Sequence, residues 1–229
     1  MSKTLIIGDV HGCLNELSDL LAACAYAEGD RVLFVGDLVA KGPNSRGVLA
    51  LYRRLGGESV RGNHDQAVLR WQDPAARAAA PERAPAHCRL ARELSDEDWG
   101  VLRALPLWLA VPEHRVLIVH GGLVPGVALE AQDPELLMNM RTLRPNGTGS
   151  RRPEDGVLWG SKWHGPERVV FGHHATAGLQ RHPLALGLDT GCVYGHALTA
   201  LILPDDRIVS VPAREAYLPI DGIPRRGSV

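Results

Sequence analysis

Short apolar runs alternate with amphipathic segments in the first part of the chain. Residues 4–7 and 31–35 are mostly β-branched or aliphatic, and each run precedes a segment, 15–25 or 45–55, whose apolar residues recur at the spacing of one helix face. This alternation predicts the strand and helix units of an α/β fold. Later runs lie closer together, which favours added antiparallel strands; they are residues 115–119, 168–171, 184–188, 198–203 and 208–211.

The segment between these two parts has no strand pattern. Residues 73–105 contain three prolines and a run rich in Ala and Arg, and Ser95 stands three residues before Asp98, as at the start of a helix with a capping box. We expect a small helical cap here. Asp133 followed by Pro134 predicts another helix start. Residues 145–155 are expected to form a loop, and residues 213–229 a C-terminal tail.

The composition is that of a globular protein with one main domain. The 229 residues are 45% hydrophobic and carry a formal net charge of -1, so we expect one domain over residues 1–212 that includes the cap. Near-neutral charge gives no general attraction for nucleic acids or membranes, and an anionic partner must be held by a local patch. We expect no membrane association and no obligate protein partner.

Cysteine spacing and the N-terminal sequence bear on location. Cys13, Cys24, Cys88 and Cys192 show no CxxC spacing, which favours reduced thiols. The first apolar run ends at Asp9, so we expect neither a signal peptide nor a membrane span. These observations predict a cytoplasmic location.

Polar side chains follow the ends of five predicted strands. Asp9 and His11 lie two residues apart after the first run, so both project to one side of an extended chain. The other groups at strand ends are Asp37, Asn63, His64, His120 and His173. Any one of these is more often a turn residue or a structural histidine than a ligand. Together, however, they form a carboxylate, imidazole and amide set that suits Mn²⁺, Fe²⁺, Co²⁺ or Zn²⁺. These groups are more than one tetrahedral site can use, even with one of them left out, which predicts two metal ions with a bridging carboxylate.

The motifs resemble those of the calcineurin-like metallophosphoesterases across residues 6–203. The motifs that carry the resemblance are GDVHG (8–12), GDLVAKG (36–42), RGNHD (61–65), HGG (120–122), GH (172–173) and LDTGC (188–192). The segments GDLVAKGPNS and LDTGCVYG are most similar to the bacterial diadenosine tetraphosphatase and the ApaH-like phosphatases. The resemblance implies an α/β (α+β) four-layer sandwich in which two packed mixed β-sheets are flanked by helices.

The resemblance also implies roles for the candidate residues. Asp9 and His11 would hold a first divalent metal, and Asp37 would bridge to a second. The remaining ligands of the second metal would be Asn63, His120 and His173. Mn²⁺ is the favoured ion, with Fe²⁺, Co²⁺, Zn²⁺ or Mg²⁺ as alternatives.

Phosphate binding and acid catalysis are assigned by the same resemblance. His64 would be the general acid and Arg61 would grip phosphate oxygens. Arg141 is a candidate for a second phosphate contact, although a solvated surface arginine explains it equally well. Lys41 would supply a positive charge without the two-pronged contact of an arginine.

The sequence departs from the related serine/threonine phosphatases at two places. Ala40-Lys41 stands where they have Asp-Arg, and Asp65 stands where they have Glu. The missing aspartate leaves open which group orients His64. Asp65 and Asp189 are expected to support the site from behind, and Asp189 would orient a metal-bound histidine.

Several neighbouring residues have more than one interpretation. His174 is expected to point away from the site because it directly follows a proposed ligand. Trp159 and Trp163 are expected in the core, with stacking on a nucleobase as the alternative. The cap arginines would neutralise phosphates or form a solvated helix face; they are Arg77, Arg83, Arg89 and Arg92.

The resemblance therefore implies a metal-dependent phosphohydrolase of the symmetrical bis(5'-nucleosyl)-tetraphosphatase type. A hydroxide that bridges the metals would attack phosphorus, and His64 would protonate the leaving oxygen. The expected substrates are dinucleoside polyphosphates, including those that cap RNA 5' ends. Tripolyphosphate or polyphosphate, and phosphoserine or phosphothreonine in proteins, are the alternatives. A binding module without activity is disfavoured because every proposed ligand is present.

Overall fold

The first of two central sheets combines the N-terminal and C-terminal strands. The computed structural model describes residues 2–81 and 85–218. This sheet has the order β13-β12-β1-β2-β3, with β1, β2 and β3 parallel and with β12 antiparallel to both β1 and β13. Its strands are β1 (Thr4–Ile7), β2 (Arg31–Phe34), β3 (Glu58–Ser59), β12 (Ala197–Leu203) and β13 (Arg207–Pro212).

The second central sheet is built from the middle of the chain and has the order β10-β11-β9-β5-β4. Its strands are β4 (Trp108–Val111), β5 (Val116–Val119), β9 (Arg168–Phe171), β10 (Gln180–Arg181) and β11 (Ala185–Gly187). The expectation of antiparallel additions is confirmed for β12 and β13 but is wrong for β9, which is parallel to both β5 and β11. The intervening segments are long enough for the crossovers that parallel pairing needs.

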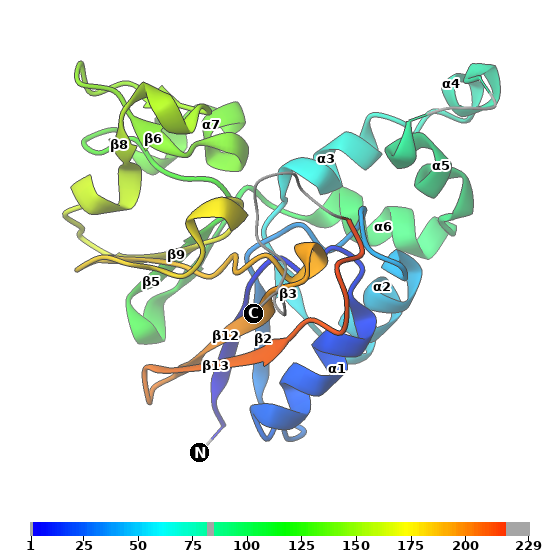
Figure 1. Cartoon of the computed structure of the whole chain (residues 1–229), viewed down its shortest axis with the longest axis horizontal. Coiled ribbons are helices and arrows are strands. Elements are labelled where there is room, and N and C mark those ends of the chain that lie inside the picture. The colour runs from blue at the N-terminus through cyan, green and yellow to red at the C-terminus, as the bar shows by residue number, and fades with distance from the viewer. Residues whose placement is uncertain (1, 82–84, 219–229) are drawn as a thin grey trace, which may run out of the picture.

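Helices α1 (Leu14–Ala23) and α2 (Ser45–Arg54) lie on the outer face of the first sheet (Figure 1). α6 (Asp96–Ala104) packs against α2 and α3 (Asn63–Leu69), whereas α5 (Ala86–Glu93) packs on α3 and α4 (Pro74–Ala79) extends from it away from the sheet. Leu17, Leu49 and Leu102 from three of these helices pack in one cluster with Leu5 and Phe34 of the sheet.

The outer face of the second sheet carries α7 (Pro134–Asn139) and a small third sheet. The strands of the small sheet are β6 (Thr142–Leu143), β7 (Gly149–Ser150) and β8 (Val157–Leu158). Single turns of 3-10 helix join the strands; they are η1 (Pro112–His114), η2 (Leu129–Ala131), η3 (Pro153–Asp155), η4 (Trp159–Lys162), η5 (Ala175–Ala177) and η6 (Cys192–Tyr194). The segment expected to be a loop, residues 145–155, thus contains β7 and η3.

The two central sheets pack face to face. Ile6 and Leu33 of the first sheet share a buried cluster with Ile118, Val170 and Leu186 of the second. Successive side chains of a strand alternate between faces, so the neighbours of these residues pack against the helices instead. Burial on both faces explains why the strands read as continuous apolar runs. The predicted four-layer sandwich is confirmed.

Local capping signals place two helix starts as predicted. Ser95 accepts a hydrogen bond from the Asp98 N–H, and Asp98 accepts one from the Ser95 N–H, which completes the capping box of α6. Asp133 caps α7 by accepting a hydrogen bond from the N–H of Glu135.

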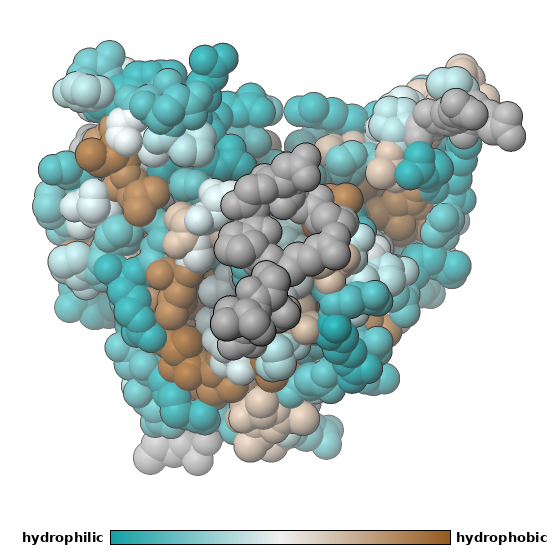
Figure 2. Space-filling view, viewed as in Figure 1, coloured by the Kyte–Doolittle hydropathy of each residue, from teal (hydrophilic) through white to brown (hydrophobic). Residues whose placement is uncertain are grey.

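The predicted tail, residues 213–229, is described as far as Leu218. Arg214 and Tyr217 in this part bind Glu16 of α1. None of the helices in the described part of the chain has the length and apolar character needed to cross a bilayer. Hydrophilic residues make up most of the face in Figure 2, which is notched at its upper edge between the cap and the part that contains α7.

Candidate metal centre

The predicted ligands converge where β1, β2, β5 and β9 end. Carboxyl ends of parallel strands meet at one edge of a sheet, and here the edges of both central sheets contribute. Five of the six side chains are buried, namely Asp9, His11, Asp37, His120 and His173, and Asn63 is partly buried.

One carboxylate oxygen of Asp37 lies at the centre of the group. His11 Nε2 lies 3.3 Å from Asp37 Oδ2, and His120 Nε2 lies 3.5 Å from the same oxygen. The other oxygen, Oδ1, accepts a hydrogen bond from the N–H of His64 at 2.9 Å. Ligand atoms of Asp9, Asp37 and His120 all lie within 4.8 Å of one another. Asp37 Oδ2 is therefore shared by two sets of ligands.

The second set surrounds the amide of Asn63. Its Oδ1 lies 2.9 Å from His173 Nδ1 and 3.0 Å from His120 Nε2. Neighbouring ligands at right angles around a cation, with bonds of about 2.1 Å, lie about 3 Å apart. The spacing of these atoms fits a divalent ion.

Each ligand histidine turns its other ring nitrogen toward a backbone carbonyl. The contacts are His11 Nδ1 to Val39 O at 3.3 Å, His120 Nδ1 to Val35 O at 2.8 Å and His173 Nε2 to Asn139 O at 3.0 Å. A carbonyl only accepts, so each of these nitrogens carries a hydrogen, and the opposite nitrogen is the one turned toward the centre. Neutral imidazoles in this orientation are what a divalent metal requires.

The charges at the centre also favour a cation. Burial, together with the charge of Asp189, raises the pKa of Asp9 well above its usual value. Burial would raise the pKa of Asp37 as well, but His120 and His11 outweigh it and hold that pKa well below its usual value. Burial lowers the pKa of His120, yet the carboxylates of Asp37 and Asp9 together raise it to about 10. A divalent ion would relieve the repulsion between these buried carboxylates.

Three of the ligands adopt a left-handed backbone conformation. His11, Asp37 and His173 have φ angles of 47°, 52° and 71°. Such conformations cost of order 1–3 kcal/mol for non-glycine residues and cluster at functional sites. The N–H of His11 donates to the carbonyl of Asp37 at 2.8 Å, so two of these residues hold each other in place.

Two glycines of the motifs are required by the carboxylates beside them. A Cβ on Gly62 would lie 2.0 Å from Asp37 Oδ1, and a Cβ on Gly172 would lie 2.1 Å from Asp9 Oδ1. Any larger residue would displace a ligand. This close approach gives the glycines of RGNHD and GH a physical role.

Asp65 lies behind the proposed ligands, whereas Asp189 lies at the pocket in front of them. Asp65 lies behind Asp37 and accepts hydrogen bonds from the N–H groups of Asp37, Leu38, Val39 and Gly62. Burial and the charge of Asp37 raise the pKa of Asp65 to about 7. Asp189 lines the pocket, and burial raises its pKa to about 6. The expectation that Asp189 orients a ligand histidine is wrong, because backbone carbonyls orient all three rings.

A pocket of about 210 Å³ opens over the ligands, and Lys41 and Arg141 both line it. Lys41 Nζ donates to His11 Nε2 at 3.0 Å and lies 5.2 Å from the centre of the Tyr194 ring. The structure does not bring Arg61 into this pocket. The Arg61 guanidinium donates instead to Gln66 Oε1 and to the Arg103 carbonyl, at 3.1 and 3.0 Å.

His64 also lines the pocket, and its partner is a residue that the motifs did not reveal. Its Nδ1 lies 2.9 Å from Nε2 of His87, in the first turn of α5. Burial lowers the pKa of His64 to about 4. The expectation for the cap rests on its arginines alone, and a histidine in that segment is the signal that points to His87.

Three other expectations concern neighbouring residues. His174 lines the pocket, so the expectation that it points away is wrong. Burial, reinforced by Arg141, lowers the pKa of His174 to about 4. Trp159 and Trp163 are buried in the core beside the second sheet, as expected, and neither lines the pocket over the ligands.

The chain is similar in sequence to bacterial proteins named bis(5'-nucleosyl)-tetraphosphatases. It is 29% identical to the asymmetrical bis(5'-nucleosyl)-tetraphosphatase PrpE of Oceanobacillus iheyensis over 94% of each chain. It is 30% identical to the symmetrical bis(5'-nucleosyl)-tetraphosphatase of Aromatoleum aromaticum over 90% of this chain and 96% of the relative. A crystal structure described as a putative diadenosine tetraphosphatase superposes with a TM-score of 0.84 at 39% identity, over 93% of this chain and 94% of the other.

The family model for the calcineurin-like phosphoesterases matches residues 2–203, and this span contains all six predicted ligands. The chain belongs to the calcineurin-like phosphoesterase family.

Proposed function

We propose that the chain is a metal-dependent phosphohydrolase that cleaves a phosphoanhydride bond of dinucleoside tetraphosphates, with symmetrical cleavage preferred. The observation that carries the proposal is Asp37 Oδ2, which lies close to ligand nitrogens of both sets at the base of a pocket lined by cationic side chains. The names of the relatives in both branches support this substrate class.

The residues at the base of the pocket would hold two divalent cations. Asp9, His11 and Asp37 would bind one. The other would be bound by Asp37, Asn63, His120 and His173. Because these ligands are nitrogen and oxygen atoms, Mn²⁺ is preferred, with Fe²⁺, Co²⁺, Zn²⁺ or Mg²⁺ as alternatives. When bound, the ions would neutralise phosphate oxygens and activate a water molecule.

Lys41, Arg141 and His64 would act on the substrate. Lys41 and Arg141 face the pocket with positive charges that bind phosphate oxygens. His64 would donate a proton to the leaving oxygen from Nε2, because Nδ1 is engaged by His87. Although burial lowers the pKa of His64, the negative charge of a phosphate bound beside it would raise that pKa again. Phosphate binding by Arg61 stays a prediction, and it requires the side chain to leave Gln66 and the Arg103 carbonyl.

A second pocket of about 300 Å³ extends the site toward the cap. Lys41 borders both pockets, and Arg46 and Arg89 line the second one. The phosphates of a polyphosphate chain that lie beyond the phosphate being cleaved would therefore also meet positively charged side chains. The other cap arginines in the described part bind carbonyls of their own region: Arg77 donates to Trp71 and Gln72, and Arg92 donates to Arg77 and Ala80. Arg83 lies outside the described residues.

The cap is part of the proposed active site. Within a catalytic domain of residues 1–212, the cap at residues 73–105 would supply His87 as the hydrogen-bond partner of His64 and Arg89 to the second pocket. The second pocket suits tripolyphosphate or polyphosphate as well, which makes these the second candidates. RNA 5' ends as substrates, the absence of an obligate protein partner and a cytoplasmic location stay predictions.

The test compares kcat/KM for diadenosine tetraphosphate, tripolyphosphate and a phosphoserine peptide in the presence of Mn²⁺. We expect the dinucleotide to be the best substrate and to yield two molecules of ADP. ATP and AMP as products would place the chain with the asymmetrical relatives. A higher value for the peptide would contradict the proposal. Asp37→Asn serves as the inactive control for contaminating phosphatases.

A further inference from the structure

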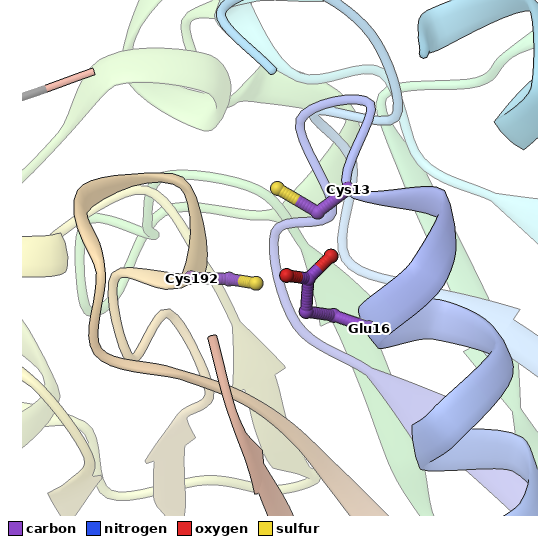
Figure 3. A group of neighbouring side chains, drawn as sticks. All are labelled: Cys13, Glu16 and Cys192. Carbon is purple, nitrogen blue, oxygen red and sulfur yellow. The ribbon is translucent and has the colours of Figure 1, made fainter. Parts of the chain in front are cut away.

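A second group of metal-binding side chains lies away from the predicted ligands. Cys13 immediately precedes α1, Glu16 lies in the first turn of that helix, and Cys192 begins η6. Their sulfur and carboxylate oxygen atoms all lie within 4.8 Å of one another, and all three side chains are buried. Figure 3 shows the two thiols and the carboxylate directed toward a common space.

The carboxylate of Glu16 has one satisfied and one unsatisfied oxygen. Oε1 accepts hydrogen bonds from the Tyr217 hydroxyl at 2.8 Å and from the Arg214 N–H at 3.0 Å. Oε2 is buried and has no hydrogen-bond partner within residues 2–81 and 85–218. The Arg214 guanidinium pairs with Asp19 instead. A fully buried carboxylate with an unsatisfied oxygen is costly unless a positive charge meets it.

The chemistry of this group differs from that of the candidate metal centre. Two sulfur ligands and one carboxylate oxygen favour Zn²⁺ or Cd²⁺, whereas the nitrogen and oxygen ligands around Asp37 suit Mn²⁺. Cys13 directly precedes α1, and its Sγ is the sulfur nearest to the start of that helix in this group. The unsatisfied oxygen of Glu16 and the two sulfur atoms grouped with it are separate observations that agree on a cation.

We propose that Cys13, Glu16 and Cys192 bind a Zn²⁺ ion, distinct from the two ions of the catalytic proposal. The three side chains supply three of the four ligands of a tetrahedral ion, and water takes the fourth place. The ion would join the loop that carries Asp9 and His11 to the turn that follows Asp189. Through its hydrogen bonds to Arg214 and Tyr217, Glu16 would also connect the ion to residues 214–217.

The test uses metal-stripped, fully reduced, full-length protein titrated with Cd²⁺. We expect one equivalent to produce the ultraviolet charge-transfer band of cadmium bound to thiolate, and Cys192→Ser to lose it. Cys24→Ser and Cys88→Ser change the other two buried cysteines and should keep the band. Asp37→Asn should also keep it, because the catalytic ligands include no sulfur. Absence of the band from the wild type, or its persistence in Cys192→Ser, would overturn the proposal.

A second measurement guards against a variant that fails to fold. In the Asp37→Asn background, Zn²⁺ should raise the apparent Tm, and Glu16→Gln added to that background should remove most of the rise. An equal rise in both proteins would contradict a site at Glu16. Thiol counts on the denatured protein should give four reduced cysteines. Two fewer would indicate a disulfide in place of the metal and would also overturn the proposal. Neither readout depends on catalytic activity.

Discussion

The imidazoles of His64 and His87 are joined by a hydrogen bond between Nδ1 of the first and Nε2 of the second, 2.9 Å apart. His87 belongs to the cap, 23 residues along the chain from His64. A second imidazole is thus the hydrogen-bond partner of the proposed acid, in a chain that has Ala40 where the serine/threonine phosphatases have an aspartate. The contact makes the cap part of the proposed reaction.

Removal of this contact should affect the chemical step. We expect His87→Ala to lower kcat by about 10- to 100-fold while KM changes little, because His64 would lose its orientation but not its phosphate contacts. The loss should be smaller for 4-nitrophenyl phosphate, whose leaving group needs little protonation.

Arg92→Ala is the matched control for a loosened cap. It removes hydrogen bonds within the cap and leaves the contact between the two histidines intact. If Arg92→Ala and His87→Ala had the same dependence on the leaving group, the role assigned to His87 would be wrong.

The glycine of the RGNHD motif should be needed for metal binding. In Gly62→Ala the new Cβ would lie 2.0 Å from Asp37 Oδ1, so the carboxylate must move. We expect Mn²⁺ affinity, measured by titration calorimetry, to fall at least about 10-fold. Gly100→Ala is the control, since its Cβ would meet nothing within 4 Å and lies in α6. It should stabilise the protein by about 0.5–1 kcal/mol without change in Mn²⁺ affinity. Unchanged affinity in Gly62→Ala would contradict the ligand role of Asp37.

The second pocket should distinguish long substrates from short ones. We expect Arg89→Ala to lower kcat/KM for tripolyphosphate and diadenosine tetraphosphate several-fold and to leave 4-nitrophenyl phosphate unaffected. Because exposed charges are screened over about 8–10 Å at 0.1–0.15 M salt, the loss should shrink as salt is added. Arg54→Ala, on the exposed end of α2, is the control. Equal losses on the long and short substrates would argue against a polyphosphate path along Lys41 and Arg89.

Much of the fold could be predicted because its signals are local. β1 and β9 have the predicted bounds, since strands buried on both faces are continuous apolar runs. The starts of α6 and α7 are set by Ser95 and Asp133, whose side chains bind N–H groups two or three residues away. The small strands β6, β7 and β8 have two residues each and leave no periodic pattern.

The site was predictable to the extent that strand ends determine it. The order of motifs is enough to gather Asp9, Asp37 and His120, but contacts between distant side chains carry no local signal. Arg61 binds the carbonyl of Arg103, and His64 meets His87, because of how the cap packs. The RGNHD motif, which contains both Arg61 and His64, carries no information about how the cap packs.

The capping box of α6 should contribute to stability in a pH-dependent way. Burial opposes ionisation of Asp98, but the hydrogen bonds from Arg53 and Ser95 outweigh it and lower the pKa of the carboxyl group. A pKa lowered by folding stabilises the protein above the unfolded pKa of about 3.9, and the stabilisation is lost as pH falls through the folded value.

We expect Asp98→Asn to lower the free energy of unfolding of the metal-free protein by about 1 kcal/mol at pH 7. The difference from the wild type should shrink as pH falls below about 4, where the unfolded carboxyl group takes up a proton, and should vanish at the lower pH where the native carboxyl group also becomes neutral. Urea unfolding at both pH values measures it. Asp96→Asn, an exposed neighbour in the same turn, should show a smaller effect at pH 7. A difference that stays constant down to pH 2 would rule out the ion pair as its cause.

The number of Mn²⁺ ions bound per chain, measured together with activity on reconstituted protein, tests the shared role of Asp37 most directly. The wild type should be inactive after a chelator has removed its metal. When Mn²⁺ is added back, it should bind two ions per chain and regain full activity as they bind. Asp37→Asn should lose tight binding of both ions and at least about 10²-fold in kcat/KM, while Asp96→Asn should match the wild type. Full turnover by the stripped protein, or two tightly bound ions in Asp37→Asn, would contradict the account.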